Sequence, residues 1–184
     1  FYAWCVPFIH VISPESVRCG ASAVISGLST RIEKPSVDPT IKNYHWGDFT
    51  RGLFEAKEQK HETAILTDKK GNITEGPGFN VFVVKEGTLI TPKEGVLLGI
   101  TRRTVLEIAE ELRLTTEVRN LSSEELLKAD EVFISSSAGG VIPLVKVNKT
   151  KYSNGKTGPI TKKIRARYWE WVELPSFSTT ISYD

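Results

Sequence analysis

Short apolar segments with strand character alternate with amphipathic segments over most of this chain. The strand-like segments are bounded by turn signals and lie at residues 63–67, 79–84, 89–90, 131–135 and 141–147. The amphipathic segments carry apolar side chains at helical spacing, and they run over residues 44–60, 99–112 and 160–172. This order of segments predicts a mixed fold of the α/β or α+β class.

Turn and capping signals separate these segments. The polar, glycine-containing runs at residues 68–72 and 85–87 are typical of turns between strands. Ser122 and Glu125 have the spacing of a capping box, which predicts a short helix before the strand at Glu131.

The N-terminal part of the chain is also predicted to be extended. Residues 1–12 and 21–32 have strand-like composition, with a turn around Ser13-Pro14-Glu15, and Pro35 and Pro39 mark a boundary. The chain contains no Met and opens in strand-like sequence. We therefore expect it to begin inside a longer protein, with part of any active site in the preceding segment.

Composition excludes several classes of protein. The 184 residues include 40% hydrophobic and 25% charged ones, which is typical of a globular domain, and the net charge of +2 is spread without a basic block. We expect no nucleic-acid partner. No apolar run approaches the length of about 20 residues that a membrane span needs. Cys5 and Cys19 form no metal-binding or disulfide pattern, so we expect a cytoplasmic protein without a metal site.

Lys42 is the first residue with possible chemistry. It stands between apolar Ile41 and the predicted helix at Tyr44. A partly buried amine there would have a lowered pKa and be nucleophilic near neutral pH. The competing interpretation is a surface lysine, which the spacing alone favours because lysines are usually solvated.

Two further loops could hold a ligand. Glu75 lies in the glycine-rich turn of residues 74–78, which could present its carboxylate, although a plain turn glutamate fits equally well. Residues 99–101, before a helix, and Ser136-Ser137, after a strand, offer N–H groups and hydroxyls suited to a phosphate. Helix capping explains Thr101 as well.

Taken together, these motifs make the chain resemble the class IV (fold type IV) pyridoxal-phosphate aminotransferases. The motifs that carry the resemblance are Ile41-Lys42-Asn43, Leu66-Thr67-Asp68, Ile73-Thr74-Glu75-Gly76 with Asn80, Gly95-Val96-Leu97-x-Gly99-Ile100-Thr101-Arg102 and the run Ser135 to Gly140. Within the family, the string from Val37 to Asp48, the run Ala138-Gly139-Gly140 and the string from Gly158 to Lys163 look most like the (R)-selective amine transaminases.

The resemblance implies a cofactor, pyridoxal 5'-phosphate, and a role for each matching residue. Lys42 would form the Schiff base with the cofactor and later move the proton. Glu75 would pair with the pyridine nitrogen and keep it protonated. Ile100 and Thr101 would bind the phosphate through backbone N–H groups, together with hydroxyls from Thr101, Ser136 and Ser137.

The resemblance also places Trp46 and Ala138 near the substrate. A core tryptophan on a buried helix face is an equally good interpretation of Trp46. Arg102 follows the phosphate loop, where a structural ion pair explains it as well as a ligand contact does. Related amine transaminases carry threonines where this chain has Ser136 and Ser137. Arg18 and Arg31 match no motif of the family, so no role is transferred to them.

The resemblance implies the large domain of the fold type IV, D-amino-acid aminotransferase-like, fold. Residues 36–184 would form this cofactor-binding domain, and residues 1–35 would be a remnant of the small N-terminal domain and the interdomain link. A phosphate-binding arginine of the small domain would be absent. The family's active sites form at a dimer interface, so the resemblance implies a homodimer.

The function implied is a transaminase that moves an amino group between a primary amine, with R preference, and a keto acid such as pyruvate. The alternatives within the fold are D-amino-acid aminotransferase, branched-chain aminotransferase and aminodeoxychorismate lyase. An alternative of another class is a non-catalytic fragment or assembly subunit that keeps the fold without a complete site.

Overall fold

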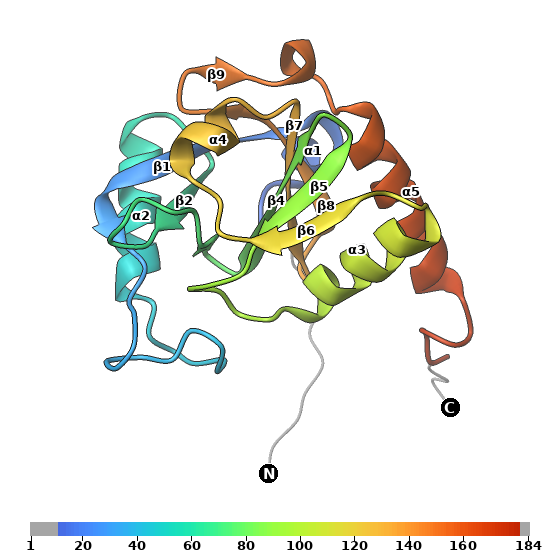
Figure 1. Cartoon of the computed structure of the whole chain (residues 1–184), viewed down its shortest axis with the longest axis horizontal. Coiled ribbons are helices and arrows are strands. Elements are labelled where there is room, and N and C mark those ends of the chain that lie inside the picture. Colours follow the sequence, from blue (N-terminus) through green and yellow to red (C-terminus); the bar gives the residue numbers. More distant parts are fainter. Residues whose placement is uncertain (1–10, 181–184) are drawn as a thin grey trace.

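A nine-stranded sheet runs through the computed structural model, which describes residues 11–180 (Figure 1). The path of hydrogen-bonded strands is β2-β1-β8-β7-β4-β5-β6, with β3 paired to β4 and β9 paired to β8. The strands are β1 (Ala21–Thr30), β2 (Thr63–Thr67), β3 (Glu75–Gly76), β4 (Phe79–Lys85), β5 (Thr88–Pro92), β6 (Thr116–Arg119), β7 (Glu131–Ser136), β8 (Gly140–Val147) and β9 (Thr150–Lys151). The helices are α1 (Pro14–Cys19), α2 (Gly47–Glu58), α3 (Ile100–Glu111), α4 (Ser123–Leu127) and α5 (Pro159–Glu173), with a 3₁₀ turn at Ser153–Gly155.

The sheet contains both parallel and antiparallel strand pairs and is packed against helices, which confirms the predicted α/β or α+β class. β4 and β5 form a hairpin, and β7 lies antiparallel to both β4 and β8. β1 and β2 are parallel and are connected through α2, while β5 and β6 are parallel and are connected through α3. Parallel neighbours need a crossover of this kind because a tight turn can only reverse the chain.

Both faces of the central strands are buried. Side chains alternate between the two faces along each strand, so neighbouring residues enter different apolar cores. On β4, Val81 and Val83 enter one apolar core, whereas Phe82 enters the other core together with residues of α3 and α5. Phe82 stacks on Phe133 of β7 at 4.9 Å between ring centroids. Figure 1 shows α3 and α5 beside each other, with α2 against β1 and β2 at the other end of the sheet.

Most of the predicted elements are confirmed, but several details differ, including the short strands β3 and β9, which were not predicted. The expected turn at Ser13 is the start of helix α1, where the Ser13 hydroxyl accepts a hydrogen bond from the Ser16 amide. The helix expected from residue 44 begins only at Gly47. Strand β6 was not predicted, because three of its four residues are exposed and the segment has no apolar alternation.

The strand expected over residues 1–12 lies almost wholly outside the described residues; Val11 and Ile12 are not in a strand. The division of the chain at residue 35 stays a prediction. β1 precedes that boundary and is paired with β2 and β8 of the same sheet. Within residues 11–180, none of the helices is both long and apolar enough to cross a membrane.

Candidate functional site

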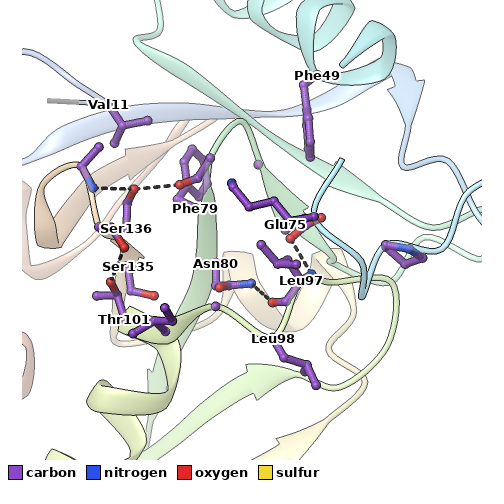
Figure 2. Close-up of a pocket in the computed structure, with 18 of the residues that line it drawn as sticks. Val11, Phe49, Glu75, Phe79, Asn80, Leu97, Leu98, Thr101, Ser135 and Ser136 are labelled. Atoms are coloured by element: carbon purple, nitrogen blue, oxygen red, sulfur yellow. Dashed lines mark hydrogen bonds between the residues drawn. The ribbon is translucent and has the colours of Figure 1, made fainter. Parts of the chain in front are cut away.

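One cavity of about 590 Å³ brings together all of the residues that the sequence analysis singled out for cofactor or substrate binding. These lining residues are Lys42, Trp46, Glu75, Ile100, Thr101, Ser136, Ser137 and Ala138. They come from loops and strand ends far apart in the sequence. Figure 2 shows the cavity with Glu75 and Leu97 toward one end and Thr101 with the serines of β7 toward the other.

Glu75 provides a buried carboxylate at the first end. It lies in the two-residue strand β3, opposite Asn80, and Gly78 makes the tight turn between β3 and β4 with φ +81°. Its Oε1 accepts from Arg31 Nε at 2.9 Å, and its Oε2 accepts from the Leu97 amide at 2.8 Å. Burial raises the pKa of Glu75, and this effect outweighs the Leu97 amide and Arg31, which lower it.

Arg31 is a site residue that the sequence analysis missed. It follows β1, is only 4% exposed and lines the cavity. Its Nη1 donates to Asp48 Oδ2 at 2.6 Å, and its guanidinium lies 4.2 Å from the centre of the Phe49 ring. The only signal in the sequence was a charged residue at the end of an apolar segment, and that signal does not identify which carboxylates the arginine will meet.

Asp48 ties this ion-pair network to the backbone. It lies in the first turn of α2, and its Oδ2 also accepts from the Ile32 amide at 2.9 Å. The carboxylate therefore holds the end of β1 against the start of α2, and Arg31 bridges it to Glu75. A negative side chain is also favourable at this helix end, because the first turn carries a partial positive charge.

Lys42 stands at the rim of the same cavity, in the irregular segment between β1 and α2. Of the two interpretations of Lys42, the structure supports the surface lysine that the spacing alone favoured, because the side chain is exposed. The segment before it is ordered by Asp38, whose Oδ1 accepts from the Thr40 amide and hydroxyl and whose Oδ2 pairs with Lys34 at 2.8 Å. Hydrogen bonds from Lys34 and Thr40 lower the pKa of Asp38 to about 2.

The N-terminus of α3 forms the other end of the cavity. Gly99 precedes the helix and supplies no side-chain acceptor to its first N–H groups, which have no partner inside the helix. A Cβ at Gly99 would lie 2.4 Å from Asn80 Oδ1, so only glycine allows this close approach of α3 to β4. Ile100 is 71% exposed and can contribute only its backbone, whereas the buried Thr101 places its hydroxyl 3.4 Å from that of Ser137.

Ser136, the last residue of β7, and Ser137, which follows it, differ in the hydrogen bonds that they make. The Ser136 hydroxyl donates to the Gly78 carbonyl at 2.8 Å and accepts from the Ala138 amide at 3.1 Å, which stabilises the turn (Figure 2). Ser137 is exposed on that turn. Ala138 lines the cavity, and its carbonyl accepts from the Val11 amide at 2.7 Å.

Trp46 forms part of the apolar wall. It is 43% exposed and packs edge-on against Phe49 at 5.5 Å, so its interpretation as a core tryptophan is wrong. Arg102 does not line the cavity. It donates to the Pro92 carbonyl at 3.0 Å and to Thr91 Oγ1 at 3.4 Å, and among residues 11–180 it has no carboxylate partner. Burial lowers the pKa of Arg102.

The donor set suits an organic anion better than a metal. In the part of the chain that the structure describes, no group of three His, Cys, Asp or Glu residues could hold a metal ion. A carboxylate at one end and uncapped N–H groups with hydroxyls at the other can bind a cationic ring nitrogen and a phosphate, respectively.

Comparison with known proteins identifies the family of this chain. Residues 8–147 match the family described as amino-transferase class IV. The branched-chain-amino-acid aminotransferase of Escherichia coli (strain K12) is 33% identical over 168 residues, which cover 89% of this chain and 53% of that protein. The chain thus spans about half the length of this curated relative.

Solved structures of such aminotransferases share the fold. The crystal structure of the E. coli branched-chain enzyme superimposes with a TM-score of 0.83 at 31% identity, covering 90% of this chain and 55% of that one. The branched-chain enzyme of Thermobaculum terrenum, in its PLP form, gives a TM-score of 0.76 at 32% identity, covering 82% of this chain and 50% of that one. On the family match and the fold together, this chain belongs to the class IV aminotransferase family.

Proposed function

We propose that this chain forms the pyridoxal-phosphate-binding part of a transaminase. The observation that carries the proposal is that a buried carboxylate, an uncapped helix N-terminus and an exposed lysine all line one cavity. A volume of about 590 Å³ lies within the usual range for small-molecule sites. Solved relatives are described with PLP, with phosphopyridoxyl-glutamate and with pyridoxamine 5'-phosphate, which supports the same ligand class here.

The residues present fit this cofactor. Gly99 lines the cavity without a side chain, and the α3 N–H groups that follow it receive no side-chain cap. When bound, pyridoxal phosphate supplies an aldehyde that an amine can bond and a ring that withdraws electrons. The phosphate would lie against Ile100 N, Thr101 and Ser137, and the ring nitrogen against Glu75.

Each side chain has a task in this proposal. Lys42 Nζ holds the cofactor and then moves a proton at the substrate carbon next to the amine. Glu75 holds a proton on the ring nitrogen, and Arg31 keeps that carboxylate in place. Trp46 and Ala138 line the substrate side of the cavity, where the apolar ring of Trp46 excludes water.

Two amine donors are proposed, each paired with a keto acid. A branched-chain amino acid is supported by the names of the relatives in the comparison. A primary amine with R preference rests on the resemblance of residues 37–48 and 138–140 to the (R)-selective enzymes. A homodimer is proposed because the active sites of the class IV family form at a dimer interface.

The cofactor assignment is tested by adding pyridoxal 5'-phosphate to the purified chain, reducing it with borohydride and mapping the labelled peptide. We expect a single pyridoxyl label, on Lys42. A label on Lys93 or Lys162, both exposed, would refute the assignment.

The donor is tested by a panel of R and S amines and L-branched-chain amino acids with pyruvate or 2-oxoglutarate. Formation of the amino product from only one class of donor would select between the two candidates. No product from any donor, with the cofactor bound at Lys42, would support the alternative of a non-catalytic fragment.

A further inference from the structure

Ser135 carries a buried hydroxyl that nothing in the described residues satisfies. The residue is 2% exposed, and its Oγ has no hydrogen-bond partner. A buried polar group without a partner destabilises a folded chain, since its hydrogen bonds to water are lost without replacement. Ser135 also lines the cavity described above, so its hydroxyl lies at the border of the space that a ligand would fill.

The strand geometry directs this hydroxyl toward α3. Successive side chains of a strand point to opposite faces of the sheet. On β7, Phe133 enters the core shared with α3 and α5, whereas Ile134 enters the other core. Ser135 therefore shares the face of Phe133 and of α3, and Ser136 lies on the opposite face. Figure 2 agrees, with Ser135 drawn near Thr101 and Ser136 pointing toward Phe79.

The neighbouring strand places Ser135 at the start of the helix. Its partner across the sheet is Asn80 of β4. Asn80 Nδ2 donates to the Leu97 carbonyl at 2.8 Å, and its Oδ1 lies 2.4 Å from the position that a Cβ of Gly99 would take. Ser135 is thus the cross-strand neighbour of Asn80, whose side chain contacts the residues just before the N-terminus of α3.

The charges at this end of the cavity favour an anion. The first turn of α3 carries the positive end of the helix dipole and no acidic residue. Arg102 in the same turn is buried and donates only to neutral acceptors among the described residues. Glu75, the acidic residue of the cavity, binds Leu97 and Arg31 at the other end.

We propose that the Ser135 hydroxyl is a donor to the phosphate group of the ligand, a role that the sequence analysis gave to Ser136. The inference rests on the proposed function and adds a residue to its phosphate site. Ser136 instead stabilises the turn, because its hydroxyl already donates to Gly78 and accepts from Ala138.

The proposal predicts opposite effects of Ser135→Ala on stability and on binding. The variant removes an unsatisfied hydroxyl, so the unfolding midpoint of the ligand-free chain should stay the same or rise. Its affinity for inorganic phosphate and for pyridoxal 5'-phosphate, measured by titration calorimetry, should fall about tenfold, because hydrogen bonds to charged groups are among the stronger ones. Affinity for pyridoxal, which lacks the phosphate, should stay within about twofold.

Ser26→Ala is the matched control. Ser26 is also buried, but its hydroxyl donates to Glu55, on the side of the molecule near α2. This variant should lower the unfolding midpoint and leave phosphate affinity unchanged. A purely structural role for Ser135 would make both variants behave alike.

The outcomes separate this inference from the proposed function. Unchanged phosphate affinity in Ser135→Ala, an equal loss of pyridoxal affinity, or a wild-type chain that binds no phosphate would overturn the role of Ser135. Phosphate binding that depends on Ser135, without a pyridoxyl label on Lys42, would support the phosphate site and refute the proposed cofactor chemistry. A label on Lys42 with no effect of Ser135→Ala would refute only the role of Ser135.

Discussion

Arg31 donates from Nε to Oε1 of Glu75 at 2.9 Å, and both side chains are almost fully buried. The pair joins the end of β1 to β3, two segments that are 44 residues apart in the chain. Because Asp48 binds the same guanidinium, one arginine pairs with two buried carboxylates, of which Glu75 lines the cavity. The position of the Glu75 carboxylate in the cavity wall therefore depends on this arginine.

Replacing Arg31 should be strongly destabilising. Arg31→Met leaves two buried carboxylates without their cation, and removing one partner of a buried pair typically costs about 3–5 kcal/mol. Urea unfolding of the ligand-free chain measures this effect. Arg103→Gln is the control, because Arg103 is 74% exposed and, within residues 11–180, pairs only with Glu107; it should change stability by less than about 0.5 kcal/mol. Equal effects of the two variants would contradict the structure of the network.

The raised pKa of Glu75 should appear as a pH dependence of stability. The folded chain holds the Glu75 proton more tightly than the unfolded chain, whose pKa is near 4.5. The resulting contribution is fully present below that pH and is lost as pH rises through the folded pKa, with a slope of at most about 1.4 kcal/mol per pH unit. The free energy of unfolding of wild type minus that of Glu75→Gln should therefore fall with rising pH.

Glu55→Gln provides a control of opposite sign. Burial alone would raise the pKa of Glu55, but hydrogen bonds from Ser26 and from the amides of Gly27 and Leu28 outweigh it and lower the pKa. The contribution of Glu55 is present above the unfolded pKa and is lost as pH falls. Urea midpoints between pH 4 and 7 would show the two differences moving in opposite directions; parallel trends would contradict the assigned shifts.

Gly99→Ala should weaken phosphate binding. The new Cβ would lie 2.4 Å from Asn80 Oδ1, so either the start of α3 shifts together with its N–H groups, or the Asn80 side chain gives up its hydrogen bond to the Leu97 carbonyl beside that helix end. We expect at least a fivefold loss in affinity for inorganic phosphate, measured by calorimetry, in line with the loss of about one hydrogen bond. Gly47→Ala at the start of α2 is the control, because no atom of the described residues lies within 4 Å of its Cβ position. Wild-type affinity in Gly99→Ala would contradict the role of this close approach.

Glu131→Ala should destabilise the packing of α5. This buried carboxylate accepts from the Ile160 and Thr161 amides and from the Thr161 hydroxyl, so it satisfies the N-terminus of α5. Leaving these donors unpaired should cost about 2–4 kcal/mol, measured by urea unfolding. Glu124→Ala, at an exposed site paired with Lys128, should cost less than about 1 kcal/mol. A small effect at Glu131 would mean that water replaces the carboxylate at this helix end.

Lys42→Ala should separate chemistry from stability. Because Lys42 is exposed, its removal should change the free energy of unfolding by less than about 0.5 kcal/mol. The variant should nevertheless lose the pyridoxyl label after borohydride reduction, as read by mass spectrometry. Lys93→Ala should keep the label, and a labelled Lys42→Ala chain would refute the cofactor assignment.

Much of the fold follows from local patterns in the sequence. Residues 100–111 form the helix that their spacing predicts, and residues 79–85 form the strand. The capping signal at Ser122 predicted helix α4, and the Ser122 hydroxyl accepts from the Glu125 amide. These features depend on neighbouring residues only. β6 was missed because its exposed residues carry no apolar pattern.

For the candidate site too, some features follow from the sequence and others only from the tertiary structure. The sequence alone determined which loops meet, because its motifs selected eight residues that all line one cavity. Only the tertiary structure decided how each side chain is used. Arg31 is hydrogen-bonded to Glu75. Ser136 is hydrogen-bonded to Gly78, whereas Ser135 lies on the face of the sheet that packs against α3. The physical reason is that side-chain direction depends on the pairing of distant strands, and a shift of one residue exchanges the two faces of the sheet.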